Sequence, residues 1–292
     1  MQFESLKVFC DLAETESFTQ AARINGVSQS AVSQAISALE NHFNARLIER
    51  SKKNFRLTTE GELVYSHSKE ILQRYDAIHN RMQEIRHIIS GEIRVATIYS
   101  IGLHELPRYV KRFMRDYPEV NVHVEYRRAN QVYDDVLGNT VDVGLVAYPE
   151  HDARWAVIPL RKEPLALACH PKHPLAKLRS VTLKALSGQS FISFEPDMPT
   201  RKALDQFLRE QRVKVQHAME FDNIETVKRA VELNCGVAIV PEAALKQEVA
   251  QQTLAAVPLE GDYFRTLGAV YRSNKVLSPA LKQFLALLKE DI

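Results

Sequence analysis

Residues 18–43 read FTQAARINGVSQSAVSQAISALENHF, and this stretch predicts two helices joined by a tight turn. The first helix stops at Asn25, because Gly26 adopts a left-handed backbone conformation at little steric cost. Ser28 then caps a longer second helix, whose apolar residues recur at helical spacing. A preceding helix is expected over residues 4–15, so the pattern predicts a helix-turn-helix.

The outer face of the second helix is uncharged from Ser28 to Leu39 and carries short hydrogen-bonding side chains. Glutamine pairs bidentately with adenine, and serine reaches base edges or phosphates. A helix face that only contacts water usually carries lysine and glutamate, so we favour entry of this helix into a DNA groove. The candidate base-reading residues are Ser28, Gln29, Ser30, Ser33, Gln34 and Ser37.

A basic hairpin, or wing, is predicted directly after this second helix. Two β-prone runs, residues 46–49 and 55–58, flank a tip that reads SKKN. A charge run is usually a solvated loop. Its position beside a helix-turn-helix instead favours contact with DNA phosphates, which positions a protein without reading the base sequence. The candidate phosphate contacts are Arg50, Lys52, Lys53 and Arg56.

The segment from Phe9 to Gly61 resembles the LysR-type family of transcriptional regulators. Asn44 stands where the family often has glycine, and Ile48 stands where it often has phenylalanine. Both replacements keep the character of the position, because asparagine tolerates a left-handed backbone and isoleucine is apolar. The matching residues are 18–22, 27–33, Ile36, Leu39, Glu40, Leu47, Arg50 and 57–61.

This resemblance implies a chain of three parts. Residues 1–58 would form a winged helix-turn-helix DNA-binding domain, and residues 59–90 a long linker helix that makes a homodimer, commonly paired again into a homotetramer. Residues 91–292 would form a bilobed α/β effector-binding domain similar to periplasmic binding proteins.

Residues 59–90 carry a heptad pattern of apolar residues over about four heptads. From Glu62 on, no proline or glycine interrupts the pattern until Gly91. An amphipathic helix packed on its own domain is the alternative, but the narrow apolar stripe favours pairing with a second copy of the chain. A two-fold dimer presents two reading helices to a DNA site of the same symmetry. The seam consists of Val64, Ile71, Tyr75, Ile78, Met82, Ile85 and Ile89.

Residues 91–292 alternate predicted strands and helices. The first set runs β-α-β-α-β, which implies a parallel sheet, and a second α/β set follows. Two consecutive α/β halves are typical of a bilobed ligand-binding domain with a cleft between the lobes, so the predicted fold class is α/β. The first lobe would hold residues 91–161 and 267–292, and the second lobe residues 162–266.

The carboxyl ends of parallel strands are where ligands bind, near helix N-termini whose N–H groups favour anions and polar oxygens. Ser100 and Thr200 occupy such places, and in the family the matching positions commonly touch the effector. Helix capping is the alternative role for both residues. Arg127 and Arg128 could add positive potential at this edge, but a solvated strand end is the favoured interpretation. The candidate effector contacts are Ser100, Asn130, Ala147, Thr200 and Arg201.

Length and composition are ordinary for a globular protein with about two domains, at roughly 150 residues each. The net charge of +2 is too small to indicate nucleic-acid binding by itself. Cys10, Cys169 and Cys235 lie in apolar contexts, which indicates buried thiols in a reducing cytosol, and no Cys/His spacing suggests zinc. The sequence shows neither signal-peptide features nor a membrane-spanning apolar run, so a cytoplasmic protein is expected.

Three other functions fit the sequence less well. An enzyme is disfavoured because motifs such as GxSxG, the P-loop and HExxH are missing. A secreted solute-binding protein would match only the C-terminal part, and another winged-helix family only the N-terminal part. The predicted function is a sequence-specific DNA-binding transcription regulator, switched by a small-molecule effector and needing no cofactor. Its expected partners are double-stranded DNA, the effector, further copies of itself and RNA polymerase.

Overall fold

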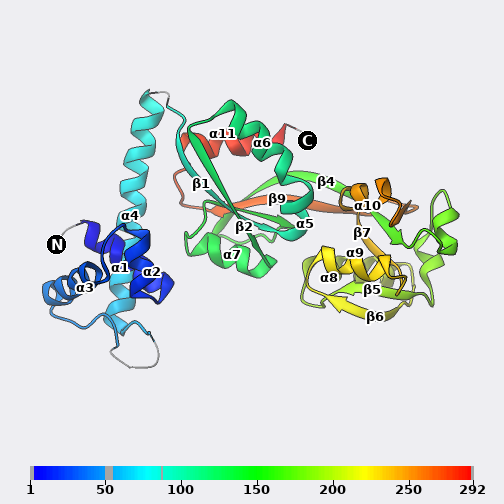
Figure 1. Ribbon diagram of the computed structural model, residues 1–292, viewed down its shortest axis with the longest axis horizontal. Coiled ribbons are helices and arrows are strands. Elements are labelled where there is room, and N and C mark those ends of the chain that lie inside the picture. Colours follow the sequence, from blue (N-terminus) through cyan, green and yellow to red (C-terminus); the bar gives the residue numbers. More distant parts are fainter. Residues whose placement is uncertain (1–2, 50–54, 87, 291–292) are drawn as a thin grey trace. The chain divides into compact units, whose positions relative to one another are not determined.

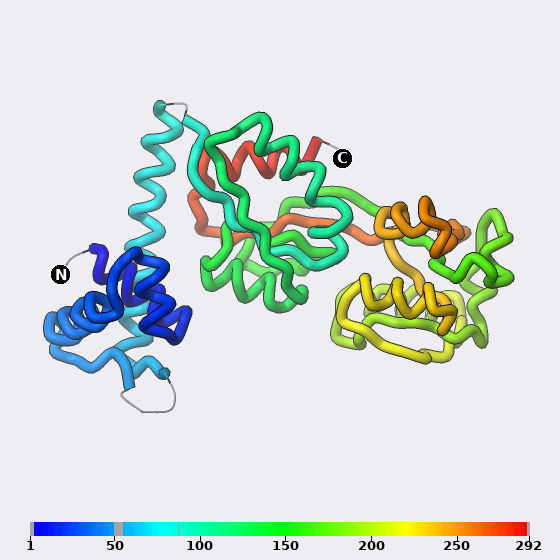
Figure 2. The backbone as a smooth tube through the Cα atoms, in the orientation of Figure 1, coloured from blue at the N-terminus to red at the C-terminus, as the bar shows by residue number. Residues whose placement is uncertain are grey.

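The computed structural model describes residues 3–49, 55–86 and 88–290, which form two compact units separated between His87 and Ile88 (Figures 1 and 2). No helix of the described residues is long and apolar enough to span a bilayer. The helices of the first unit are α1 (Phe3–Thr15), α2 (Phe18–Ile24), α3 (Gln29–Phe43) and α4 (Thr59–Arg86).

The first unit has its own apolar core between α1, α2, α3 and the start of α4. Phe9, Leu12 and Val32 are completely buried in it. The predicted turn between α2 and α3 is confirmed, since Gly26 has a φ of +64° and the Ser28 hydroxyl accepts the N–H of Ala31 at 3.2 Å. α3 ends at Asn44 in the left-handed conformation, with a φ of 49°.

A short antiparallel contact follows α3 and forms the base of the predicted hairpin. Ile48 and Leu57 pair in an isolated bridge. The N–H of Glu49 donates to the carbonyl of Arg56 at 2.9 Å, and the N–H of Thr58 donates to the carbonyl of Leu47 at 3.1 Å. These bonds fix the two arms of the hairpin against the end of the helix-turn-helix.

α4 begins against this hairpin base. The Thr58 hydroxyl accepts the N–H of Gly61 at 2.9 Å, and Gly61 lies so close to the backbone of Leu47 that a β-carbon would stand 2.1 Å from its carbonyl oxygen. Further along, Tyr65 and Lys69 both bind the Glu14 carboxylate of α1. The first turns of α4 are therefore part of the helix-turn-helix unit.

The apolar seam of α4 is exposed beyond these first turns. Ile78 is 63% exposed and Ile85 65%, which is costly for side chains of this size unless something covers them. The helix was expected to reach residue 90, but the described helix ends at Arg86. Ile89 is therefore not part of the seam, and it packs instead against the core of the second unit.

The second unit consists of two lobes, here called lobe 1 (residues 88–163 and 265–290) and lobe 2 (residues 164–264). Lobe 1 contains the predicted parallel arrangement, because β1 pairs in parallel with β2 and β3. α6 and α11 cover one face of this sheet and α7 the other (Figure 1). The elements are β1 (Gly91–Ile98), α5 (Tyr99–His104), α6 (Leu106–Asp116), β2 (Val120–Arg127), α7 (Ala129–Leu137), β3 (Val143–Ala147) and α11 (Pro279–Lys289).

Lobe 2 has a separate core around its own helices and shorter strands. β5 and β6 pair in parallel, while β7 and β8 add to the end of the long strand β4. The strand β8 and the 3-10 helices η1 and η2 were not predicted, whereas η3 and α10 occupy the place of a helix that was predicted over residues 243–248. The elements are η1 (Pro174–Lys177), η2 (Leu183–Leu186), β5 (Ser190–Phe194), α8 (Pro199–Glu210), β6 (Gln216–Phe221), α9 (Ile224–Glu232), β7 (Ala238–Pro241), η3 (Glu242–Leu245), α10 (Lys246–Ala250) and β8 (Ala255–Pro258).

Two long strands, β4 (Trp155–Cys169) and β9 (Phe264–Arg272), cross from one lobe to the other as an antiparallel pair (Figure 2). The sequence predicted only the second half of β4, beginning at Pro164. The seven-stranded sheet has the order β2-β1-β3-β9-β4-β7, with β8 on β4. Glu163 and Arg265 are direct cross-strand partners at the crossing, which places a charged pair at the hinge.

Candidate functional site

The outer face of α3 presents every side chain that the sequence assigned to base reading. All six are exposed, but their hydroxyls and amides differ in availability. Ser28 caps the helix and shares a 2.8 Å hydrogen bond with Ser30, so its oxygen already serves the helix start. The side-chain amides of Gln29 and Gln34 form no hydrogen bond with any described residue, which leaves both available to an external partner.

The basic hairpin is described only at its base. Arg56 is exposed on the second arm, next to the residues that pair with the first arm. Arg50, Lys52 and Lys53 lie outside the described residues. Of the four predicted phosphate contacts, Arg56 lies within the described residues.

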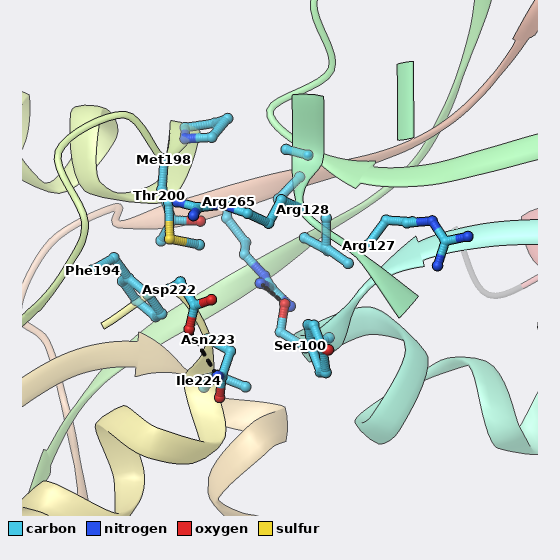
Figure 3. A pocket seen from close by; sticks show the side chains of 15 residues that line it. Ser100, Arg127, Arg128, Phe194, Met198, Thr200, Asp222, Asn223, Ile224 and Arg265 are labelled. Atoms are coloured by element: carbon cyan, nitrogen blue, oxygen red, sulfur yellow. Dashed lines mark hydrogen bonds between the residues drawn. The ribbon is translucent and has the colours of Figure 1, made fainter. Parts of the chain in front are cut away.

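A pocket lies between the two lobes of the second unit (Figure 3). Its empty space, counted together with the open solvent at the mouth, measures about 480 Å³. Three of the predicted effector contacts meet here: Ser100 and Ala147 from lobe 1 and Thr200 from lobe 2. The other lining residues are Ile98, Tyr99, Arg127, Arg128, Ala129, Phe194, Met198, Pro199, Asp222, Asn223, Ile224 and Arg265.

Two predicted contacts are not placed at this pocket. Asn130 is exposed on α7. Arg201 is 8% exposed, and its guanidinium turns back into lobe 2, where it donates to the carbonyl of Phe194 at 2.7 Å and to Asp205 at 2.9 Å. The guanidinium of Arg201 finds its hydrogen-bond partners within lobe 2. It therefore does not reach the pocket, although Arg201 is next to Thr200 in the sequence. Among the described residues, neither side chain lines the pocket.

Arg127 and Arg128 line the pocket, contrary to their interpretation as a solvated strand end. Arg128 crosses to lobe 2, where it forms an ion pair with Glu195 and bonds of 3.3 Å with Asp197. Arg127 remains within lobe 1 and binds Asp135 at 3.0 Å. One of the two arginines is thus a bridge between the lobes at the pocket mouth.

A second bridge joins the lobes through His104 of α5. Its Nε2 lies 2.8 Å from Glu225 of α9, and the buried Lys228 binds the same carboxylate at 3.0 Å and Glu248 at 2.7 Å. Burial lowers the pKa of His104, and the positive charge of Lys228 acts in the same direction. A neutral His104 that donates its Nε2–H to Glu225 accounts for this arrangement.

Arg265 is a pocket residue that the sequence did not identify. It is 2% exposed, and its guanidinium binds Glu163 at 2.5 Å and the Ser100 hydroxyl at 2.8 Å. Figure 3 shows this guanidinium in the middle of the lining side chains, directed toward Ser100. Its partners are 102 and 165 residues away in sequence, and no local pattern marks such pairing.

The described residues contain no group of three histidine, cysteine or acidic side chains placed to hold a metal ion. Burial raises the pKa of the Cys10 thiol to about 12 and that of Cys169 to about 11. Cys235 is only half buried, so the prediction of three buried thiols holds for the first two.

Sequence comparison identifies both parts of the chain. Residues 3–62 match the family described as bacterial regulatory helix-turn-helix protein, lysR family, and residues 87–292 match the LysR substrate binding domain. The HTH-type transcriptional regulator YeiE of Escherichia coli K12 is 30% identical over 96% of this chain and 94% of its own length. The HTH-type transcriptional activator CmpR of a Synechocystis strain is 28% identical over 97% of this chain and 92% of its own.

Solved structures of low sequence identity share the fold. A full-length variant of OxyR from Pseudomonas aeruginosa has a TM-score of 0.81 at 22% identity, covering 99% of this chain and 94% of its own. CbnR in complex with its target DNA has a TM-score of 0.66 at 19% identity, covering 100% and 99%. The effector binding domain of QuiR in complex with shikimate has a TM-score of 0.63 at 21% identity, covering 69% and 97%. Because the family matches span both units, the chain belongs to the LysR family and is a DNA-binding transcription regulator with an effector-binding domain, not an enzyme.

Proposed function

We propose that this regulator is switched by a small molecule that binds in the pocket between lobe 1 and lobe 2. The observation that carries the proposal is the composition of the pocket, whose walls come from both lobes at the crossing of β4 and β9. A ligand that touches Ser100 on one side and Thr200 on the other favours the arrangement in which both are in reach. Differential affinity for two arrangements is what a ligand-driven switch requires.

DNA binding in this scheme uses α3 for base reading and the wing for phosphates. The amides of Gln29 and Gln34 have the geometry for adenine edges in the major groove, whereas Arg56 carries only charge to the backbone. Ser33 and Ser37 lie on the same exposed face. Arg50, Lys52 and Lys53 remain proposed phosphate contacts from the sequence alone.

We further infer that two chains pair through the exposed seam of α4 and present two α3 helices to a dyad site, with a second pairing giving a homotetramer. Ile78 and Ile85 would bury most of their area in such a pairing. The assembled regulator would act in the cytoplasm together with RNA polymerase. The scheme requires no cofactor, because its steps are the binding of DNA, of the effector and of further copies of the chain, and none of them is a chemical reaction.

The DNA-reading roles are tested by comparing Gln29→Ala with Arg56→Ala. Gln29→Ala should reduce discrimination between the true site and random DNA by about 1–3 kcal/mol. Arg56→Ala should weaken binding to both DNAs alike and flatten the salt dependence. Binding is measured by footprinting and by titration across a salt series, first on the DNA upstream of the protein's own gene. Equal loss of discrimination in both variants would contradict the division of roles.

The switch is tested with the same footprint in the presence of pocket ligands. A ligand whose binding depends on Thr200 should change the length or spacing of the protected DNA, and Thr200→Val should abolish that change while leaving the ligand-free footprint intact. A saturating pocket ligand that leaves affinity, footprint and transcription unaltered would contradict the switch.

A further inference from the structure

The guanidinium of Arg265 forms part of the pocket floor although the residue is almost fully buried. Arginine has five N–H donors, and the bonds to Glu163 and Ser100 use the Nε and Nη1 groups. The Nη2 group has no hydrogen-bond partner among the described residues, and it is not among their fully enclosed unpartnered atoms. Its donors therefore reach the open space of the pocket.

The charge that balances Arg265 is shared with a second cation. Glu163 is 3% exposed and binds Arg265 through one carboxylate oxygen and Arg161 through the other, at 3.2 Å. Desolvation lowers the pKa of Arg265, while the charge of Glu163 opposes this effect. Arg161 also pairs with Glu105, so the cluster holds two arginines and two carboxylates. A buried cation such as Arg265 still gains from a further anion that its free donors can reach.

Two hydroxyl groups stand beside this cation. Ser100 accepts a hydrogen bond from Arg265, which leaves its own O–H proton to donate into the pocket. Thr200 is 6% exposed and its hydroxyl has no partner among the described residues. Thr200 also lies in the first turn of α8, a helix of 12 residues whose N-terminal N–H groups favour negative charge. Three donor groups, those of Arg265, Ser100 and Thr200, thus face the pocket, and the one carboxylate of the lining, Asp222, accepts a hydrogen bond from Asn223 at 2.9 Å.

Apolar side chains from both lobes also line the pocket. Ile98 of lobe 1 and Phe194, Met198 and Ile224 of lobe 2 surround the polar floor. Arg127 and Arg128 also line the pocket and bind acidic groups of the protein, but both are partly exposed, so Arg265 is the buried cation of the lining.

We propose that the effector is a small carboxylate with an apolar body, and that Arg265 is the residue that selects its negative charge. This inference rests on the proposed function, because it names the chemical class that the pocket accepts. The carboxylate would receive hydrogen bonds from Nη2 of Arg265 and the hydroxyls of Ser100 and Thr200, and the apolar body would lie against Phe194 and Met198.

The experiment compares charged probes with neutral isosteres on the full-length protein. Isovalerate, phenylacetate and cyclohexanecarboxylate are each paired with the corresponding amide, and binding is measured by thermal shift and by calorimetric titration. At least one acid should bind more tightly than its amide, and Arg265→Gln should weaken that binding by at least about 10-fold. Glu163→Gln should strengthen it, because Arg265 then lacks its counter-charge.

Two further variants separate this role from a loss of folding. The double variant Arg265→Gln with Glu163→Gln removes both buried charges and should also lose the preference for the acid. Arg272→Gln, at the lobe 1 end of the same strand, should keep it. The proposal is overturned if no acid binds, if the amides bind as well as the acids, or if Arg265→Gln retains the preference.

The same probes distinguish this proposal from the switch. An acid that binds through Arg265 without altering the footprint would support the carboxylate class and contradict the switch. A neutral probe that binds in the pocket and alters the footprint would support the switch and contradict the carboxylate class.

Discussion

Single residues at close approaches carry much of the specificity of this fold. Gly61 is the clearest case, because the start of α4 lies against the carbonyl of Leu47 at a distance that excludes any side chain. The same contact joins the hairpin base to α4, so the orientation of α4 on the hairpin depends on the missing β-carbon of Gly61.

We expect Gly61→Ala to lower the free energy of unfolding by about 1–2 kcal/mol. Alanine gains up to about 1 kcal/mol of helix propensity, but the backbone must shift to admit the β-carbon, and such overpacking costs about 1–3 kcal/mol. Urea denaturation of the full-length protein measures the change. Ser66→Ala, at an exposed site on the same helix, is the control, and equal stability of the two variants would refute the packing argument.

His104 makes the contact between the lobes sensitive to pH. Its pKa is lowered from 6.5 in the folded protein, so the unfolded chain binds more protons below about pH 6.5 and stability falls as the solution is acidified through that range. The pKa of Glu225 is also lowered: burial opposes this, but the hydrogen bonds from Lys228 and His104 prevail. Its contribution is likewise lost at acid pH, below that of His104.

We therefore expect His104→Gln to flatten the decline in melting temperature between about pH 6.5 and 5, because glutamine does not titrate. His123→Gln is the matched control, since His123 is exposed in the same lobe. A parallel decline in wild type and His104→Gln would show that His104 does not report on folding.

At the scale of elements, the helices of the first unit and the strands β1, β2 and β3 of lobe 1 were predictable because their signals are local. Ser28 caps α3, Asn44 ends it, and the alternation of β2 is visible in the sequence. The short helix α5 was missed because it follows β1 without a capping side chain. The first half of β4 was missed because its pairing partner, β9, lies about a hundred residues away in sequence.

The pocket was predictable in part for the same reason. Ser100, Ala147 and Thr200 follow strand ends and could be located from topology. The position of the Arg265 guanidinium depends on a cross-strand pair and on a contact with α5. The Arg201 guanidinium is instead bound by groups of lobe 2. Contacts with residues distant in sequence decide where each of these two side chains lies, and the sequence next to each arginine does not indicate those contacts.

The seam of α4 makes a prediction about assembly. Ile78→Glu should place a charge in the centre of the dimer contact and shift the protein toward monomer, with at least a 10-fold weaker dimer from about 1.5–3 kcal/mol of lost burial. Ala77→Glu adds the same charge on the next residue, outside the seam, and should leave assembly unchanged. Analytical ultracentrifugation distinguishes the two, and an unchanged mass for Ile78→Glu would argue against pairing through this face.

At the scale of the whole effector domain, the two lobes are held by the β4–β9 crossing and by polar bridges on both sides of the pocket. Arg128 to Glu195 is the bridge at the mouth. It is partly exposed, so its contribution to holding the lobes together is at most about 1 kcal/mol.

Charge reversal tests this bridge. Arg128→Glu should speed backbone hydrogen exchange in the first turn of α8 by up to about fivefold, because repulsion favours separated lobes. Adding Glu195→Arg restores the pair and should restore protection. If the double variant exchanges as fast as the single one, the bridge does not hold the lobes.

The position of β9 has a consequence for the order in which the chain is made. This strand lies between β3 and β4 in the sheet, yet it leaves the ribosome only after all of lobe 2. Until then β3 and the first half of β4 lack their shared neighbour, while α1 to α4 are already complete. A message cut short before residue 264 therefore yields a finished helix-turn-helix attached to an unfinished sensor, and only translation through β9 produces a regulator that can respond.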